Sequence, residues 1–294
     1  MITLSEAEAV DVGLSSVEEK DEIRVFQALD SLAGIAGDFI KEKEELDAER
    51  VIRCIDEIAQ AAVGEGMELV AINSVLAMGK LAKASVEKGG ESTLNKSVVV
   101  IGKLGRASAA NGLEAGSKVA ITTLMEIRKV SPTQKGQEET ITMCVTLKEI
   151  GAAAAAQGME DTLLSAITFL GEIGKNAAGE GLETETLSTL ILLEELGKLA
   201  AEKYSDEALS SSALSIEEIG KLSFKKGLYG TVLQSQWALE TLKVQAEEQI
   251  LTSSTIVAEL ALENFESMKI GDTEENVEKL KEIKELHAKI LSGL

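Results

Sequence analysis

Two consecutive stretches of 23 residues, GMEDTLLSAITFLGEIGKNAAGE (158–180) and GLETETLSTLILLEELGKLAAEK (181–203), share one pattern of residue types. Both begin with Gly, and Leu170 in the first corresponds to Leu193 in the second. A common spacing of glycine and apolar residues indicates an internal repeat, and a repeat of 20–50 residues determines the whole fold.

The same spacing extends over most of the chain. We call the positions that are spaced by 23 residues and include Gly66 and Gly181 the grid points, and we number each unit backward from its grid point. Positions −11 and −8 are then Ile, Leu or Met in every unit between residues 55 and 242, and position −4 is Ala or Ser. The pattern continues for one unit in each direction, which predicts about eleven repeats and one further C-terminal segment. The grid points that carry glycine are Gly66, Gly89, Gly112, Gly158, Gly181 and Gly227.

Each unit is predicted to be one helix. Small residues at −15 and −4 and large apolar residues at −11 and −8 give spacings of 4, 3 and 4, which place them on one helical face. The grid glycine fits a helix C-cap, where the left-handed conformation costs glycine little. With loops of about 4–6 residues, roughly 17–19 residues remain for each helix. Residues expected to cap the helix N-termini are Thr93, Thr162, Thr184, Ser205 and Thr231.

Short loops between equal helices predict antiparallel neighbours and a 46-residue helical hairpin. The fold class is therefore all-α, an α-α superhelix (solenoid) of about eleven to twelve antiparallel helices with 23 residues per helix. Its period and pattern resemble HEAT and armadillo repeats, although the Pro and Arg-Asp signatures common in HEAT units are absent. We expect an acidic N-terminal tail or partial cap at 1–22, the solenoid at 23–273 and a charged amphipathic capping helix at 274–294.

A second series of small residues at −7 includes Gly105, Gly174, Gly197 and Gly220. Glycine inside a helix costs about 1 kcal/mol relative to alanine, so its repetition predicts a close approach of neighbouring helices. A tight Ala/Gly seam leaves no room for rings, which agrees with an aromatic content of only 3%.

Composition excludes several kinds of chemistry. His287 is the single histidine, which argues against histidine-based catalysis and the usual zinc sites, and we expect no metal and no cofactor. Cys54 and Cys144 are isolated in the sequence, so reduced cysteines and a cytoplasmic location are expected. We find no apolar stretch of about 18 residues or more in the sequence, so a membrane span is not expected. The net charge of −21 argues against nucleic-acid binding by the whole surface.

The negative charge lies mainly toward the ends, because residues 1–50 carry a net −9 whereas residues 51–150 carry a net +1. Basic residues of three successive predicted helices in this neutral region could form a site for an anion or an acidic partner. The alternative is scattered surface charge. These residues are Lys80, Lys83, Lys103, Arg106, Arg128 and Lys129.

Two further groups could bind a partner. Acidic residues at −9 (Glu149, Glu172, Glu195, Glu218) form either a carboxylate ladder or a solvated face with i,i+3 partners such as Lys175 and Lys221. Aromatic residues near the end of the chain are either interface anchors or bulky core residues of a terminal repeat. They are Tyr204, Phe224, Tyr229, Trp237 and Phe265.

The sequence thus favours a non-enzymatic scaffold that presents a concave solenoid surface to a protein or peptide, as a monomer or homodimer. One alternative is an enzyme or small-ligand binder of the HEAT-like type that uses carboxylates and lysines in a deep pocket. Another is nucleic-acid binding through the region between Lys80 and Lys129, although no nucleic acid is the expected partner.

Overall fold

The computed structural model describes residues 4–131 and 137–266, and every regular element among them is a helix. The chain divides into two compact units, Met1–Gln157 and Gly158–Leu294, which are described separately. The helices of the first unit are α1 (Glu6–Glu18), α2 (Glu22–Glu42), α3 (Glu45–Gly64), α4 (Glu68–Lys88), α5 (Glu91–Ala110), α6 (Glu114–Val130) and α7 (Gln137–Ala156). Those of the second unit are α8 (Glu160–Glu180), α9 (Glu183–Glu202), α10 (Asp206–Lys226), α11 (Tyr229–Glu248) and α12 (Thr252–Glu266).

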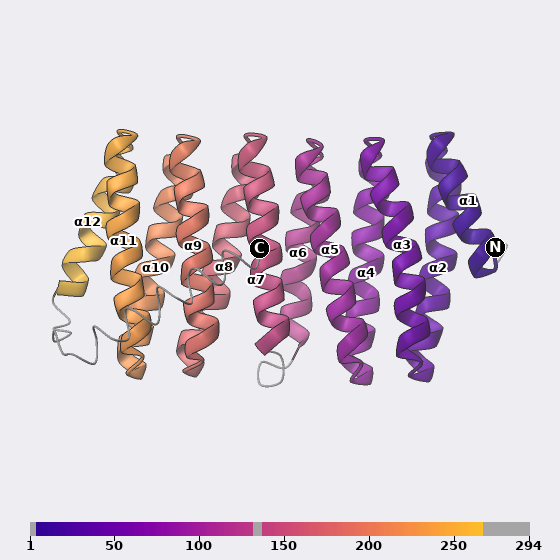
Figure 1. Cartoon of the computed structure of the whole chain (residues 1–294), viewed down its shortest axis with the longest axis horizontal. Coiled ribbons are helices and arrows are strands. Elements are labelled where there is room, and N and C mark those ends of the chain that lie inside the picture. The colour runs from indigo at the N-terminus through magenta and orange to yellow at the C-terminus, as the bar shows by residue number, and fades with distance from the viewer. Residues whose placement is uncertain (1–3, 132–136, 267–294) are drawn as a thin grey trace. The chain divides into compact units, whose positions relative to one another are not determined.

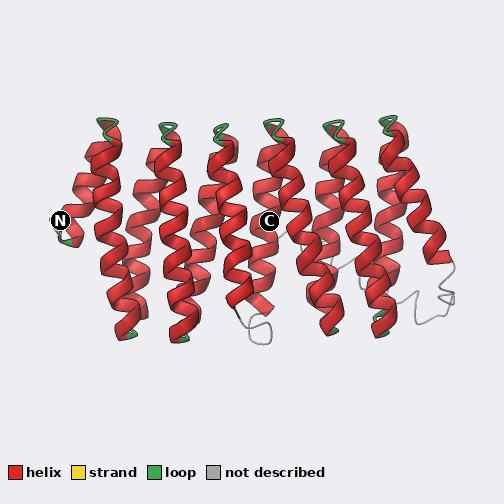
Figure 2. Cartoon of the chain, turned by 180° about the vertical axis from the view of Figure 1, so that it is seen from behind, coloured by secondary structure: helices red, strands yellow, loops and turns green. Residues whose placement is uncertain are grey.

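Consecutive helices are antiparallel and alternate between two layers within each unit (Figures 1 and 2). In the first unit α2, α4 and α6 pack side by side in one layer, and α1, α3, α5 and α7 do so in the other. In the second unit α8, α10 and α12 form one layer, and α9 and α11 form the other. We call these the even layer and the odd layer. This arrangement confirms the all-helical repeat of stacked hairpins.

The helices are longer and the loops shorter than the sequence predicts. Helix α8 has 21 residues and α9 has 20, and only Gly181 and Leu182 separate them. Three residues then lead from α9 to α10, which begins at Asp206. Apart from α6 and the terminal helices α1 and α12, even helices have 21 residues and odd helices 20, and alternating linkers of two and three residues complete the 46-residue hairpin.

At every grid point among the described residues, the grid residue adopts the left-handed conformation, as predicted; α6 differs, because it ends at Ser131 in an extended conformation. Gly181 has φ 80°, and its amide donates to the carbonyl of Ala178 at 3.2 Å. The amide of Leu182 donates to the carbonyl of Ala177 at 2.9 Å, which completes a Schellman motif. The small residue at −4 is thus the acceptor of the capping bond. Four grid points adopt the same conformation without glycine, namely Lys20, Lys43, Tyr204 and Ile250.

Most of the expected N-caps are wrong. Only Ser205 caps a helix, accepting from the amide of Ala208 at 3.3 Å. Thr93, Thr162 and Thr231 lie inside the first turns of their helices and are buried. The fifth candidate, Thr184, is also inside a helix, as the second residue of α9.

At some helix N-termini, the free backbone amides donate to an acidic side chain of the preceding hairpin. This acidic residue is the first residue of its own helix. The carboxylate Oε1 of Glu68, which begins α4, accepts from the amides of Ala115 (2.9 Å) and Gly116 (3.4 Å) in α6. Asp206, which begins α10, accepts from the amides of Ser253 (3.3 Å) and Ser254 (2.8 Å) in α12. Caps that come from another repeat cannot be found by inspecting the residues next to the helix.

Glycine seams hold the layers together, as the −7 series predicts. A Cβ on Gly105 would lie 2.7 Å from the Cβ of Ala120 and 2.7 Å from Cδ1 of Ile150. The sequence analysis missed a second seam at position −10. A Cβ on Gly171 would lie 2.5 Å from Oγ of Ser215, one hairpin further along the chain.

The N-terminal helix α1 occupies part of the 1–22 segment for which a tail or partial cap was expected. It packs on α2 and α3 and buries Ala9 and Val17. A Cβ on Gly13 would meet Cδ1 of Ile58 at 2.6 Å. The capping helix expected at 274–294 lies outside the described residues.

Candidate interaction surface

The two layers separate the basic residues that the sequence analysis grouped together. Helices α4 and α6 carry four of them in the even layer: Lys80, Lys83, Arg128 and Lys129. The other two, Lys103 and Arg106, lie on α5 in the odd layer. The structure therefore does not bring the six residues into one cluster, because successive helices belong to different layers.

Several of these side chains pair with acids of the next hairpin. Lys83 contacts Glu126 at 2.6 Å, and Arg106 contacts Glu149 at 3.6 Å. In both pairs a base at −6 meets an acid at −9 exactly one hairpin further on, a separation of 43 residues. The hydrogen bond from Lys83 holds the pKa of Glu126 below its usual range.

In the second unit, Lys175 pairs with an acid of the next hairpin in the same way, but Lys221 does not. Lys175 of α8 contacts Glu218 of α10 at 3.0 Å, again 43 residues apart. Lys221 instead contacts Glu217 on its own helix at 2.5 Å. Exposed pairs of this kind contribute little individually, about 0–1 kcal/mol.

The four acids at −9 do not form a single ladder. Glu149 and Glu195 lie on the odd helices α7 and α9, whereas Glu172 and Glu218 lie on the even helices α8 and α10. Each layer thus receives alternate members of the series.

The aromatic residues also separate. Phe224, at the end of α10, meets Tyr229, at the start of α11, with ring centroids 6.3 Å apart and planes at 75°. Phe265 is buried against Gly220, and Tyr204 is exposed in the loop before α10. Trp237 lies in the middle of α11 and is partly exposed.

Trp237 belongs to a row of apolar residues on the outer side of the odd layer in the second unit. The row occupies positions −17 and −13, which alternate with the core positions and point away from the even layer. Leu187 and Ile191, which are both buried, occupy these positions on α9, and Leu233 and Trp237, which are both half-buried, occupy them on α11. Val244, seven residues or about two turns beyond Trp237 and on the same side of α11, is 49% exposed. We call these five residues the outer apolar row.

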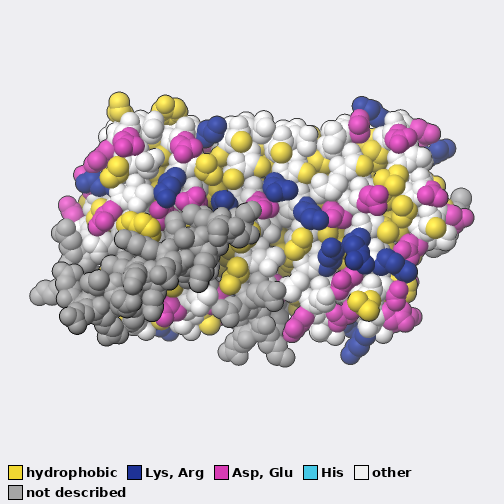
Figure 3. Space-filling model, viewed as in Figure 1, with side chains coloured by type: hydrophobic (Ala, Val, Ile, Leu, Met, Phe, Trp, Pro, Cys, Tyr) yellow, Lys and Arg dark blue, Asp and Glu magenta, His cyan; other side chains and the backbone are white. Residues whose placement is uncertain are grey.

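The corresponding positions differ among the odd helices of the first unit: α5 has Asn95 and Val99, α7 has Ile141 and Val145, and α3 has charged residues. On α3 they are Glu49 and Arg53, and the guanidinium of nearby Arg50 contacts Glu6 at 3.1 Å. Figure 3, which views the odd layer, shows Lys and Arg side chains gathered over α3 and α5. The outer apolar row is therefore a feature of particular helices and is not required by the repeat. Of the outer apolar row, the sequence analysis identified only Trp237, because it considered the core positions of each helix and not the positions on the outer side.

Polar side chains border the outer apolar row. Glu194 of α9 is fully buried, and Nζ of Lys198 lies 2.7 Å from its Oε1. Nε2 of Gln234, on α11, donates to the other carboxylate oxygen at 3.2 Å. Burial lowers the pKa of Lys198, but the hydrogen bonds and charges of Glu194 and Glu195 outweigh it and leave the pKa raised. Lys198 therefore remains protonated and neutralises part of the buried charge.

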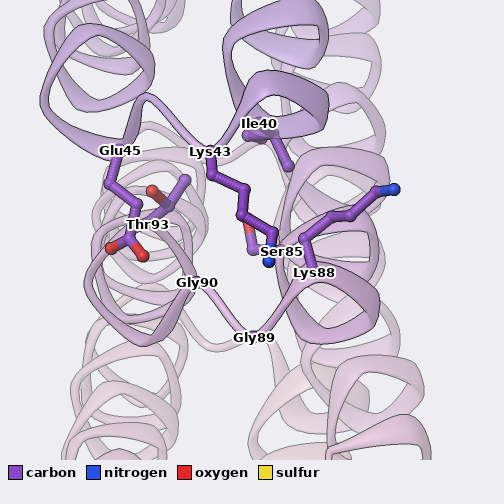
Figure 4. Close-up of a pocket in the computed structure, with 8 residues that line it drawn as sticks. All are labelled: Ile40, Lys43, Glu45, Ser85, Lys88, Gly89, Gly90 and Thr93. Atoms are coloured by element: carbon purple, nitrogen blue, oxygen red, sulfur yellow. The ribbon is translucent and has the colours of Figure 1, made fainter.

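The cavities of the described residues are small or shallow. One of about 160 Å³ lies between the α2–α3 and α4–α5 loops, where Glu45 lies beside Gly90 and the buried Thr93, and Lys43 extends toward Ser85 (Figure 4). An open groove on the even layer of the second unit is lined by Leu164, Asp206, Glu207, Ser210, Ser211, Leu214 and Ser253. Neither encloses the deep pocket that the enzyme alternative predicts.

Other features concern metals and membranes. Across residues 4–131 and 137–266, no three His, Cys, Asp or Glu side chains are grouped so that they could hold a metal ion. Both cysteines are free thiols. One helix, α4, is long and apolar enough to cross a membrane by length and composition, with a mean hydropathy of 1.4. It packs between α2, α5 and α6, as a core helix of a repeat array does.

Comparison with known proteins supports the fold alone. No family model and no curated protein matches the sequence. Among solved structures, the chain is similar to a circular tandem repeat protein described as having a novel repeat topology and enhanced subunit contact surfaces. The TM-score is 0.61 at 17% sequence identity, over 97% of this chain and 74% of that one.

The chain is thus a helical tandem-repeat protein of the solenoid type. Its specific assignment to HEAT or armadillo repeats is not confirmed, because the similarity lies in the repeat architecture and not in a family signature.

Proposed function

We propose that this protein is a non-catalytic interaction scaffold whose outer apolar row binds an amphipathic helix of a protein or peptide partner. The observation that carries the proposal is the position of Leu233, Trp237 and Val244 on the side of α11 that does not face the even layer. Leu233 and Trp237 are half-buried there, and Val244 is exposed. Contiguous apolar residues on an outer face are typical of interaction sites.

The spacing of the row suits a helical partner. Residues at −17 and −13 recur on α9 and α11, so the row crosses neighbouring parallel helices. Packed helices lie about 8–10 Å apart, so one further helix could contact both α9 and α11. Tryptophan is enriched among residues that dominate binding energy, so Trp237 is the expected anchor. The remaining basic residues, Lys80 and Lys129 in particular, are secondary candidates for contacts on the even layer.

The cytoplasmic location and the absence of catalysis belong to this proposal. Free cysteines agree with a reducing compartment. The repeat architecture supports a scaffold, although a fold alone carries function only weakly.

A matched pair of substitutions tests the proposal. Trp237 and Arg53 occupy the same position, −13, on α11 and α3. Immobilised W237E and R53E are compared with the original chain as baits for proteins of the source cell. We expect specific binders to be lost with W237E and retained with R53E. Binding that survives W237E unchanged, with both variants folded by circular dichroism, contradicts the proposal, as does turnover of a small substrate.

A further inference from the structure

The outer side of the even layer in the first unit carries large apolar residues that the repeats leave exposed. Ile23 of α2 and Leu69 of α4 both occupy position −20, and they are 69% and 57% exposed. Leu76, at −13 on α4, is 45% exposed, and Phe26 and Ile72, at −17, are half-buried. Because α2 and α4 pack side by side, these five residues adjoin one another, and we call them the even apolar face.

This face belongs to particular helices and is not required by the repeat. On α6, the next helix of the layer, positions −20 and −17 are Ala115 and Lys118. On α4 the apolar residues surround the helix, since only half of its most apolar stretch of 18 residues is buried. A helix that is apolar all round is normally covered on every side, and contiguous exposed apolar residues mark an interaction site.

Equal positions on the even helices lie nearly level with one another. A Cβ on Gly79, at −10 on α4, would lie 2.5 Å from Cγ2 of Thr123, at −12 on α6. Nζ of Lys83, at −6, contacts Glu126, at −9 on α6, at 2.6 Å. The position numbers therefore show which outer residues would meet if two such layers faced each other.

We propose that two copies of this chain associate through their even apolar faces, related by a two-fold axis that passes through α4 between Ile72 and Leu76. The inference goes beyond the proposed function, because it concerns another layer and another occupant, and the outer apolar row takes no part in it. Two-fold contacts of this kind use the same surface on both copies, so the surface must be complementary to itself.

The charges of the face meet this requirement. The axis reverses the helix direction and exchanges α2 with α6, so position −13 on α2 lies opposite −17 on α6 of the second copy. These positions are Asp30 and Lys118. An acid therefore meets a base on both sides of the axis. Lys118 also contacts Glu114 on its own helix at 3.0 Å, which leaves its ammonium at the outer surface beside α4.

The apolar residues also meet one another. Leu76 lies opposite Ile72 of the second copy, and the reverse contact forms across the axis. Ile23 of α2 lies opposite the half-buried Met125, at −10 on α6 of the second copy. The contacts that exclude most water are thus at the centre, and the charged pairs lie around them, as is typical of stable interfaces.

Other charges on α4 agree with the arrangement. Lys80, at −9, lies opposite Glu68, at −21, of the second copy. One pair of like charge results, between Glu22 and Glu126 of the second copy, and Lys83 already contacts Glu126. The remaining charges therefore favour association.

The face is large enough for a stable dimer. Helices α2 and α4 have 21 residues each, so they are about 30 Å long at 1.5 Å per residue. Three helices spaced 8–10 Å apart make a face about 25–30 Å wide. The resulting area of roughly 800 Å² matches what each partner buries in a typical stable complex.

Sedimentation velocity at several concentrations tests the inference. We expect a species of twice the mass of one chain, and L69D should raise its dissociation constant about ten-fold or more. L46D is the matched control, because Leu46 also occupies −20 and is 82% exposed, but lies on α3 in the odd layer. It should leave association unchanged. A chain that is monomeric at every concentration, or equal effects of L69D and L46D in folded variants, overturns the inference.

A charge exchange tests the two-fold arrangement itself. D30K and K118D each place like charges opposite each other on both sides of the axis, so each should raise the dissociation constant about ten-fold. The double variant D30K/K118D recreates pairs of opposite charge and should restore the association of the original chain. A double variant that associates as weakly as the single ones overturns the inference. Monomers that bind vesicles of anionic phospholipid through Leu69 would assign the face to a lipid surface and also overturn it.

Discussion

Gly174 of α8 receives the side chain of Ile219 from α10, so closely that a Cβ on the glycine would lie 2.5 Å from Cδ1 of Ile219. Cγ2 of Thr189 lies 2.9 Å from the same point. Glycine is retained inside this helix because the two neighbours occupy the space that any side chain would need.

The first prediction concerns this seam. G174A should lower the free energy of unfolding by about 1–2 kcal/mol, because overpacking costs more than the helix propensity that alanine adds. G179A in the same helix is the control, since nothing lies within 4 Å of its added Cβ. G179A should be neutral or stabilising in urea unfolding. Equal effects of the two substitutions would contradict a steric origin.

The second prediction concerns the left-handed grid residue Ile250, which has φ 58° and a side chain that is 85% exposed. I250G should raise the stability by about 1 kcal/mol, because glycine adopts this conformation without the steric cost of a β-branched side chain. I250A removes the exposed apolar side chain but keeps a Cβ, and it should gain less. Thermal unfolding of the three proteins distinguishes relief of backbone strain from loss of apolar surface.

The third prediction concerns the cap that Asp206 provides for α12. Burial acts to raise the pKa of Asp206, but hydrogen bonds from Ser254 and Ser253 outweigh it and hold the pKa below its usual 3.8. A depressed carboxyl pKa contributes stability above pH 3.8 that is lost as the pH falls through the native pKa. D206N should therefore cost about 1 kcal/mol at pH 7 and progressively less at acid pH. The exposed neighbour Glu207 is the control, and E207Q should leave the stability at pH 7 nearly unchanged.

The fourth prediction has the opposite sign. Burial raises the pKa of Glu139 in α7 above its usual 4.5, although the hydroxyl of Ser131 donates to its Oε2 at 3.0 Å and the charge of Arg128 opposes the shift. The native state therefore binds the proton more tightly than the unfolded chain, and stability falls as the pH rises from 4.5 through the native pKa. E139Q keeps an acceptor for Ser131 and should be more stable than the original chain at pH 7. This difference should disappear below pH 4.5, as measured by chemical unfolding at several pH values.

The sequence predicts the elements of the repeat that depend on residues of one helix. The left-handed conformation of Gly181 and the close approach at Gly105 both follow from the residue type at a fixed position. These features are local or repeat with every unit, so one chain without homologues reveals them.

What the sequence did not reveal depends on contacts between repeats. The acceptor for the N-terminus of α6 is Glu68, 47 residues before Ala115, and it cannot be found in the adjoining loop, which consists of Asn111, Gly112 and Leu113. Glutamate at the second residue after most grid points was the signal that could have predicted it. Similarly, Lys83 and Arg106 share position −6 but belong to different layers, and position within a unit does not specify the layer.

The alternation of helices and linkers has a consequence for how such a chain can change in length. The Glu68 cap spans 47 residues and the Lys83–Glu126 pair spans 43, so each of these contacts joins a hairpin only to the next one. Removing residues 68–113 would join Met67 to Glu114 and leave an odd helix followed by an even one. Gains or losses of whole hairpins preserve every type of contact, whereas gain or loss of a single 23-residue helix would place every later helix in the opposite layer. The molecule is built so that duplication and deletion of 46 residues are its natural modes of evolutionary change.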